Sequence, residues 1–291
     1  MFLFMGIGAI LFKKKFISEE GSKSLGNLLI RLVLPCVIIN AFLVERTPER
    51  MKALAISLGT AVILLTLSIL VSRLLFHKDP VRHFASAFSN PGFFGIPLIG
   101  AVLSGDAIFY VAPFIACLNI LQWTYGVAVL KEQKSRIDIK TIIFSPFIIS
   151  FAIGLLLFFS GIQLPEIVGD VVSSSAGLNT PIAMIVSGVY LAKVNLKSMF
   201  TAKRLYMLTA VRLCLIPLVS AVVLCLLPNT YYEMKICLLI AAACPVGSNV
   251  AVYAQLHNKD YVYAVETVVM STLFSIVTIP VLLMIFQNFW A

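Results

Sequence analysis

The stretch Ser89–Pro97, "SNPGFFGIP", places two prolines, two glycines and an asparagine in the middle of an apolar run from about 81 to 103. Proline inside a helix removes a backbone hydrogen bond and clashes with the preceding turn. The order Asn90-Pro91 instead suits the start of a helix, because the Asn side chain can accept from free N–H groups and proline has none to leave unpaired. We therefore expect a helix that breaks and begins again here.

The composition predicts that this break lies in a membrane. Of the 291 residues, 60% are hydrophobic and only 12% are charged, about half the charged fraction of a soluble domain. Apolar runs of about 20 residues, the length that crosses the hydrocarbon as a helix, recur along the chain between short charged gaps. The sequence thus predicts an all-α integral membrane protein with ten transmembrane helices. The expected helices are 1–12, 24–44, 53–76, 80–104, 107–130, 141–161, 166–192, 205–227, 232–256 and 262–288. The first is short, so either the start of the chain lacks several residues or the bilayer thins around it.

Lys and Arg are distributed unevenly between alternate gaps. The odd-numbered gaps hold 16 of the 22 and the even-numbered gaps hold 4, while Arg31 and Arg212 lie within expected helices. By the positive-inside rule the odd gaps are cytoplasmic, and with ten helices both termini face outward. The formal charge of +9 then reflects topology, and its spread over five short loops argues against a nucleic-acid partner.

A second break resembles the first. The stretch "ACPVGSNVAVYAQ", Ala243–Gln255, again combines helix breakers with polar residues, and Pro245 follows Pro91 by 154 positions. An odd number of crossings reverses the second copy of a repeat, so two five-helix halves would be antiparallel. The sequence predicts a first inverted repeat at 1–130, a short basic cytoplasmic linker at 131–140 and a second repeat at 141–291. Inverted repeats with discontinuous helices are typical of secondary transporters.

Two further prolines fit this repeat but have a simpler alternative. Leu34-Pro35 and Thr180-Pro181 are predicted to interrupt the second and seventh helices, 146 positions apart, and Thr180 is expected to cap the helix that Pro181 opens. Each proline taken alone is more simply a kink that its neighbours repair. The paired breaks at Asn90 and Asn249 favour function over a kink.

At these residues the sequence resembles the auxin efflux carrier family of transporters. The similarity rests on "SNPGFFGIPLIGAVLSG", with an Asn followed five residues later by Gly-Ile-Pro, and on "ACPVGSNVAVYAQLHN" and "STLFSIVTIPV". The resemblance implies crossing broken helices four and nine, a scaffold of helices one, two, six and seven, and a mobile transport part. Asn90, Pro91 and Pro245 match crossover residues of the family, whereas plant members lack an Asn at the position of Asn249. The short connection at 131–140 is similar to that of bacterial members, which are associated with small carboxylates such as malate and malonate, and implies a multi-pass protein of the bacterial inner membrane.

The physical chemistry of the two breaks predicts an anion site. Where each second half-helix begins, free N–H groups and the positive end of the helix dipole point into the crossing. The expected substrate-binding residues are Asn90, Pro91, Gly92, Gly95, Pro245, Gly247, Ser248 and Asn249. Asn119, Gln122 and Gln255 are candidate neighbours, with hydrogen bonding between helices as the alternative role for the first two.

Three ionisable residues lie within expected helices and are functional candidates for that reason. Arg212 is about eight residues into its helix and is expected to face protein or water, where it could offset the charge of a carboxylate. Glu266 could anchor its helix at the interface or, if it reached the crossing, couple transport to H⁺ or Na⁺. Arg31 is expected to be an interface anchor.

These observations predict a secondary active transporter, or permease, that moves a small organic anion, a mono- or dicarboxylate, across the plasma membrane by alternating access. The alternatives are an anion channel and a non-transporting membrane sensor. We expect no enzyme, since no nucleophile and base lie together at the breaks and no nucleotide-binding loop or zinc motif is present. The six cysteines are expected to be packing residues, without metal or cofactor. The expected partners are the anion and the lipid bilayer, and the sequence leaves a homodimer open.

Overall fold

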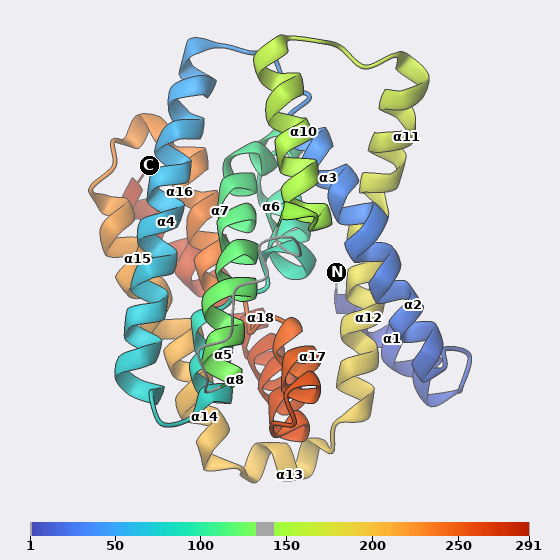
Figure 1. The fold of residues 1–291 in the computed structure, drawn as a ribbon. Coiled ribbons are helices and arrows are strands. Elements are labelled where there is room, and N and C mark those ends of the chain that lie inside the picture. Colours follow the sequence, from blue (N-terminus) through green and yellow to red (C-terminus); the bar gives the residue numbers. More distant parts are fainter. Residues whose placement is uncertain (1, 132–142, 291) are drawn as a thin grey trace.

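The computed structural model describes residues 2–131 and 143–290, and these residues form helices and connecting turns without a strand (Figure 1). Six helical stretches are long and apolar enough to cross a membrane: Glu19–Ala41, Pro48–Phe76, Gly105–Lys131, Glu166–Lys193, Lys203–Cys225 and Tyr261–Trp290. Shorter apolar helices cover Phe2–Lys13, Pro91–Val102 and Pro146–Ser160. The chain is therefore a multi-pass membrane protein. The predicted linker at 131–140 lies, after Lys131, outside the described residues.

Helix is present in each of the ten expected ranges, while the crossing of the membrane by all ten and the inverted repeat remain predictions. In chain order the helices are α1 (Phe2–Lys13), α2 (Glu19–Leu28), η1 (Leu29–Val33), α3 (Leu34–Ala41), α4 (Pro48–Phe76), α5 (Pro80–Ala87), η2 (Pro91–Gly95), α6 (Ile96–Val102), η3 (Gly105–Ala107), α7 (Ile108–Leu121), η4 (Gln122–Gly126), α8 (Val127–Lys131), α10 (Pro146–Ser160), α11 (Glu166–Gly177), α12 (Asn179–Lys193), α13 (Leu196–Thr201), α14 (Lys203–Ala210), η5 (Val211–Leu215), α15 (Ile216–Cys225), η6 (Asn229–Tyr231), α16 (Tyr232–Ala243), α17 (Asn249–Leu256) and α18 (Tyr261–Trp290).

One sequence pattern begins three of these helices. Thr47, Asp79 and Asn90 each precede a proline, and each side chain accepts a hydrogen bond from a backbone N–H three residues later. The cap satisfies one of the free N–H groups of the first turn, and proline fits the first helical position because it lacks an N–H. The expected cap at Asn90 is thus confirmed.

Three other prolines follow a widened turn. η1, η2 and η5 are π-turns, closed by the bonds Leu34 N–H to Leu29 O, Ile96 N–H to Pro91 O and Ile216 N–H to Val211 O. In each case the next residue is proline, which has no N–H and whose ring would crowd an α-helical turn. The interruption predicted at Leu34-Pro35 is therefore a widened turn inside a continuous helix rather than a break.

The interruption predicted at Thr180-Pro181 was misplaced. The helix turns at Leu178, α12 begins at Asn179, and no side chain caps that start. Thr180 therefore does not have the capping role expected of it, because it lies inside the first turn of α12.

The helices form two bundles that lie side by side (Figure 1). In the first bundle α1 packs along α12, while α10 and α11 pack on α3. In the second, α4 contacts α5, α7 and α15, and α16 contacts α7, α15 and α18. Close approach in the first bundle depends on glycine: a Cβ at Gly8 would lie 2.3 Å from the Ile185 carbonyl oxygen, and one at Gly154 would lie 2.4 Å from the Phe42 ring. Small residues at such contacts let helix backbones approach closely in membranes.

The two ends of the molecule differ in charge. At one end, called the basic end, Lys193 pairs with Glu19 at 3.7 Å and Arg204 with Asp260 at 3.4 Å, which brings together the turns that follow α1, α12 and α17. At the opposite end Arg50 pairs with Asp106 at 3.5 Å, between α4 and η3. In Figure 1 α13 lies at the basic end and the α10–α11 connection at the opposite end. The basic residues around these turns therefore share one end.

Candidate functional site

The two broken helices meet at their breaks. Ser89 and Val246 form an antiparallel bridge. Asn90 N–H donates to the Pro245 carbonyl at 3.0 Å, and Gly247 N–H donates to the Phe88 carbonyl at 3.0 Å. Unpaired backbone groups are costly at membrane depth, and this reciprocal pairing satisfies part of what each break exposes. Two segments about half the chain apart are thus fixed to each other. We call the place where residues 88–90 and 245–247 meet the crossing.

The helix starts at the crossing still carry unpaired donors. Phe93 N–H donates to the Asn90 side-chain oxygen at 3.4 Å, but the backbone N–H groups of Gly92, Ser248 and Asn249 have no hydrogen-bond partner among the described residues. The first N–H groups of a helix lack partners within the helix, and the dipole makes that end positive. Ser248 precedes α17 without forming a side-chain cap, and it lines the cavity between the two helix starts.

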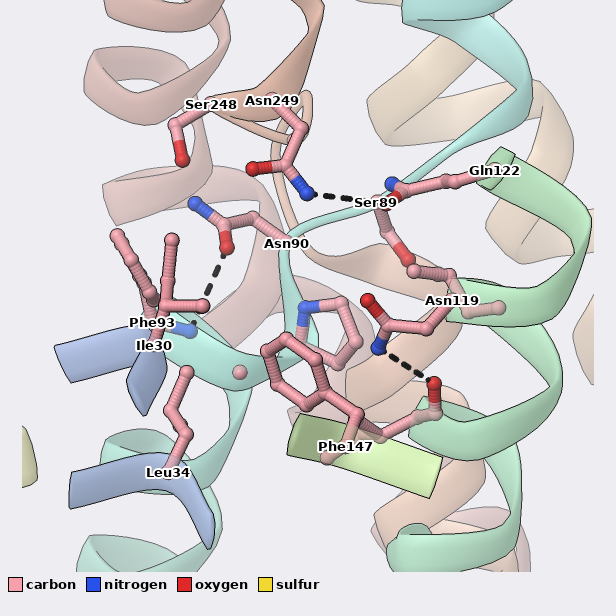
Figure 2. Close-up of a pocket in the computed structure, with 15 residues that line it drawn as sticks. Ile30, Leu34, Ser89, Asn90, Phe93, Asn119, Gln122, Phe147, Ser248 and Asn249 are labelled. Atoms are coloured by element: carbon pink, nitrogen blue, oxygen red, sulfur yellow. Dashed lines mark hydrogen bonds between the residues drawn. The ribbon is translucent and has the colours of Figure 1, made fainter. Parts of the chain in front are cut away.

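A small cavity of about 40 Å³ lies between these helix starts (Figure 2). Six of the eight predicted substrate-binding residues line it: Asn90, Pro91, Gly92, Gly247, Ser248 and Asn249. The wall is completed by Ile30, Leu34, Ser89, Phe93, Ile115, Leu118, Asn119, Gln122 and Phe147. We call this space the crossing cavity. Among the described residues its lining holds no ionisable side chain.

Three amide side chains on one wall of the crossing cavity, Asn119, Gln122 and Asn249, are held by hydrogen bonds. The Asn249 side-chain nitrogen donates to the Gln122 side-chain oxygen at 3.0 Å, and the Asn119 nitrogen donates to the Ile115 carbonyl at 2.8 Å. Figure 2 shows the Asn90 amide nitrogen directed toward Ser248, on the side of the cavity away from these two bonds. Asn249 and Gln122 therefore link α17 to η4, while Asn90 retains free donors.

Gly95 and Pro245, also predicted to bind substrate, do not line the cavity. A Cβ on Gly95 would lie 3.0 Å from the Cys244 sulfur, so Gly95 allows η2 to approach the other break. Pro245 contributes its carbonyl to the bond with Asn90. Both residues shape the crossing and face away from a ligand there.

Arg212 is buried in protein, away from the cavities. It is 1% exposed and lines none of the cavities described here. Its Nε–H donates to the Cys244 carbonyl at 3.1 Å, its Nη1 donates to the Ser86 carbonyl at 2.9 Å, and its Nη2 donates to the Ala242 carbonyl. Arg212 therefore faces protein, one of the two surroundings expected for it, and its donors are turned to backbone carbonyls at the ends of two helices. That it offsets the charge of a carboxylate stays a prediction.

Polar residues outside the predicted set also form hydrogen bonds to the backbone at the two breaks. Ser271 accepts from Val246 N–H at 3.0 Å, and the Ser68 hydroxyl donates to the Ala87 carbonyl at 2.7 Å. Asn179 is buried and its amide nitrogen donates to the Gly92 carbonyl at 3.3 Å, from the first bundle to the second. The signal in the sequence was a lone polar residue in an apolar helix, which does not reveal its partner.

A family model described as membrane transport protein, the auxin efflux carrier family, matches residues 1–283. The chain belongs to this family. No individually curated protein matches it. Because the match runs through both breaks and both bundles, membership in the membrane transport protein family applies to the whole architecture described above.

In this family member two larger cavities lie between the crossing cavity and the basic end, each sharing lining residues with the next. An inner cavity of about 290 Å³ shares Ile30, Phe93, Ser248 and Asn249 with the crossing cavity. A mouth cavity of about 640 Å³ shares Lys23, Lys193, Gln255 and Tyr261 with the inner cavity. Gln255 thus lies on the route to the crossing rather than at it.

The two remaining charged candidates, Glu266 and Arg31, do not line the crossing cavity. Glu266 lines the mouth cavity and not the crossing cavity, so it does not meet the condition set for a coupling role at the crossing. Arg31 lies in η1 and is exposed, a position compatible with the interface anchor that was expected.

Proposed function

We propose that this chain is a secondary active transporter for a small organic anion of the mono- or dicarboxylate class, working by alternating access in a bacterial cell membrane. The observation that carries the proposal is the crossing cavity, which is lined by residues of two helix starts with unpaired N–H groups and by no carboxylate. It is a transporter by family, and the anion, the mechanism and the location are our inference.

The donors of the crossing cavity favour an anion over a cation. Helix N-termini bind anions through free N–H groups and the positive end of the dipole. Cations such as Na⁺ or Ca²⁺ require converging oxygen ligands, and the Phe88 and Pro245 carbonyls at the breaks are already paired. The free donors of Asn90 and Ser248 add neutral hydrogen bonds to a carboxylate without a fixed charge that would hold it too tightly to leave.

The arrangement of cavities favours a carrier over a channel. From the basic end the mouth and inner cavities lead to the crossing, whereas the cavity of about 490 Å³ at the opposite end shares no lining residue with the crossing cavity. Asn179 and Leu34 stand between them, with the Asn179 amide bonded to Gly92 O and the Leu34 methyl groups about 3.5 Å from a Cβ built on Gly92. Access from one end only is what one state of an alternating-access cycle requires.

The crossing cavity is too small for a carboxylate in this state. Each water needs roughly 10–15 Å³ of such space, so about 40 Å³ holds only a few water molecules. The site must therefore widen when substrate arrives from the inner cavity. Because Asn249 and Ser248 line both cavities, a small movement of the α17 start relative to η2 would join them.

The packing supports an inverted repeat. If helices one to five correspond to six to ten, α1 on α12 and α10 on α3 are equivalent contacts, and both occur. The antiparallel bridge between Ser89 and Val246 joins the break of helix four to that of helix nine, the two helices that this exchange would interconvert. We propose that the two repeats at 1–130 and 141–291 are related in this way, with both termini outside.

A counterflow experiment tests the proposal. A thermal-shift screen of mono- and dicarboxylates first identifies a ligand, since a molecule that binds only the folded state raises the melting temperature. Purified protein in liposomes loaded with that unlabelled carboxylate should then accumulate the labelled compound transiently. A channel would only let the label equilibrate, and a sensor would bind it without any uptake. Either result would contradict the carrier assignment.

A further inference from the structure

The first half of each broken helix ends at the same buried side chain. α5 ends at Ala87 and α16 at Ala243, and the carbonyls of Ser86, Ala242 and Cys244 at these ends accept hydrogen bonds from Arg212. Its Nη1 also lies 3.4 Å from the Ser68 hydroxyl of α4. One guanidinium in η5 thus contacts three other helices.

The chemistry of helix ends explains why a cation is placed there. The last four carbonyls of a helix have no partner within the helix, and the dipole makes that end negative. At the crossing two such ends converge at membrane depth, where water cannot satisfy them. Arginine suits this position because its planar guanidinium presents five donors in several directions, whereas a lysine ammonium directs three donors from one point.

No carboxylate competes for Arg212. Among the described residues no Asp or Glu forms an ion pair with it, and every hydrogen bond that it makes is to a backbone carbonyl or a serine hydroxyl. The four helix ends that meet at the crossing therefore have two kinds of surroundings. The two C-terminal ends share Arg212, and the two N-terminal ends face the crossing cavity.

We propose that Arg212 is a positioning residue that fixes the C-terminal ends of α5 and α16 to η5, so that the two breaks move as one rigid unit and keep their free N–H groups directed at the ligand. It acts without touching substrate. The inference goes beyond the transport function, because it describes how the crossing is held and does not depend on which molecule is carried.

Two native cysteines, Cys237 in α16 and Cys244 directly after it, provide a test that needs no substrate. All six cysteines are unpaired, and Cys237 and Cys244 are both fully buried. Cys244 lies in the crossing, with its sulfur 3.0 Å from a Cβ built on Gly95, whereas Cys237 lies about two turns earlier and contacts the Ala107 carbonyl at 3.3 Å. Alkylation of Cys244 therefore reports local opening of the crossing, and alkylation of Cys237 reports opening elsewhere in α16.

The experiment uses full-length single-cysteine proteins that retain either Cys244 or Cys237. We expect Arg212→Gln to accelerate alkylation of Cys244 by at least tenfold while the rate for Cys237 changes by less than twofold. Arg212→Lys should restore part of the protection, because it keeps the charge but cannot reach all the carbonyls. The matched control is Lys235→Gln. Lys235 is a second buried cation, in α16, and it donates to the Leu227 carbonyl and to Asn229, away from the crossing. Its removal should leave the alkylation rate of Cys244 unchanged.

Several outcomes would overturn the inference. Equal acceleration at both thiols in Arg212→Gln would mean that Arg212 supports global stability only, and no acceleration at Cys244 would mean that the crossing holds together without it. If Arg212→Gln does not insert into the membrane, the test rests on Arg212→Lys alone, with the alkylation rate of Cys244 again compared with that of Cys237. Failure of both to insert while Lys235→Gln inserts would also contradict the proposal, since a retained charge should preserve the fold.

Discussion

Asn90 carries two roles that a pair of substitutions can separate. Its side-chain oxygen caps Phe93 N–H, and its amide nitrogen is free on the side of Ser248 (Figure 2). Asp is as good an N-cap as Asn, whereas loss of the cap in an alanine variant costs about 1 kcal/mol. The Asp side chain, however, would lack the donors and place a negative charge beside the ligand.

We therefore predict that Asn90→Asp and Asn90→Ala rank in opposite orders for stability and for binding. Asn90→Asp should melt at or above the temperature of Asn90→Ala but bind the carboxylate more weakly. Loss of one neutral hydrogen bond costs about 0.5–1.5 kcal/mol, while charge repulsion at close range costs several kcal/mol at an effective dielectric near 20. Affinity and melting temperature are to be measured above pH 7, where the introduced carboxyl is ionised. Tighter binding by the Asp variant than by the Ala variant would end the anion assignment and leave the fold intact.

At the scale of the element, the crossing depends on how closely two backbones approach. A Cβ on Gly247 would lie 3.0 Å from the Ser89 carbonyl oxygen and 3.4 Å from that of Phe88. A Cβ on Gly92 would meet only the flexible methyl groups of Leu34 at 3.5 and 3.6 Å, an ordinary contact. The two glycines therefore differ in what a single methyl group does.

We predict that Gly247→Ala disrupts the crossing and that Gly92→Ala does not. Overpacking against backbone costs about 1–3 kcal/mol, so Gly247→Ala should lower the melting temperature and reduce transport at least tenfold, whereas Gly92→Ala should keep both near the parent values. Gly92→Leu, which cannot avoid Leu34, should insert without transporting. Equal activity of Gly247→Ala and Gly92→Ala would show that the close approach of Gly247 to the Ser89 carbonyl is not required.

The same elements show how far the sequence could be used. Both breaks were predicted because Asn90-Pro91 and the Pro245–Asn249 stretch carry their own local signals for a helix start. Arg212 was expected to face protein or water, but the carbonyls that it contacts could not be predicted, because sequence gives the depth of a residue along a helix and not its rotation or its partners. The turn at Leu178 was placed two residues too late, at Thr180-Pro181, although Gly177 disfavours a helix directly before it. Packing of Asn179 against η2 accompanies the turn and could not be predicted. Local chemistry predicted where the helices break, but packing determines what each break contacts.

At the scale of the whole molecule, the uneven charge predicts the orientation in the membrane. Gln163 lies exposed in the α10–α11 connection at the opposite end, and Lys197 lies exposed in α13 at the basic end. With the basic end in the cytoplasm, a cysteine at Gln163 should react with an impermeant maleimide added to intact cells. A cysteine at Lys197 should react only after the membrane is opened. The reverse labelling pattern would invert the topology without changing the fold.

The route from the basic end to the crossing has a charge of its own. Lys23 and Lys193 line both the mouth and the inner cavity, while the carboxylates of Glu19 and Glu266 line only the mouth. An anion that moves from the mouth cavity to the inner cavity therefore leaves a lining with two lysines and two glutamates and enters one with the two lysines and neither glutamate. A cavity lined by one sign of charge raises the local concentration of ligands of the opposite sign, and salt weakens this effect.

We predict that Lys23→Gln and Lys193→Gln each raise the KM for anion uptake from the basic end about two- to fivefold at low ionic strength, as expected for a steering charge that is lost. The difference from the parent protein should shrink at 0.15 M salt and above, where the Debye length falls to about 8 Å. Lys193→Gln should have the larger effect because it also leaves Glu19, its partner at 3.7 Å, without compensation. Lys197→Gln is the matched control, since Lys197 is exposed at the same end but lines neither cavity. An equal rise in KM for Lys197→Gln, or a rise that does not depend on salt, would show that the cavity lysines do not guide the anion to the crossing.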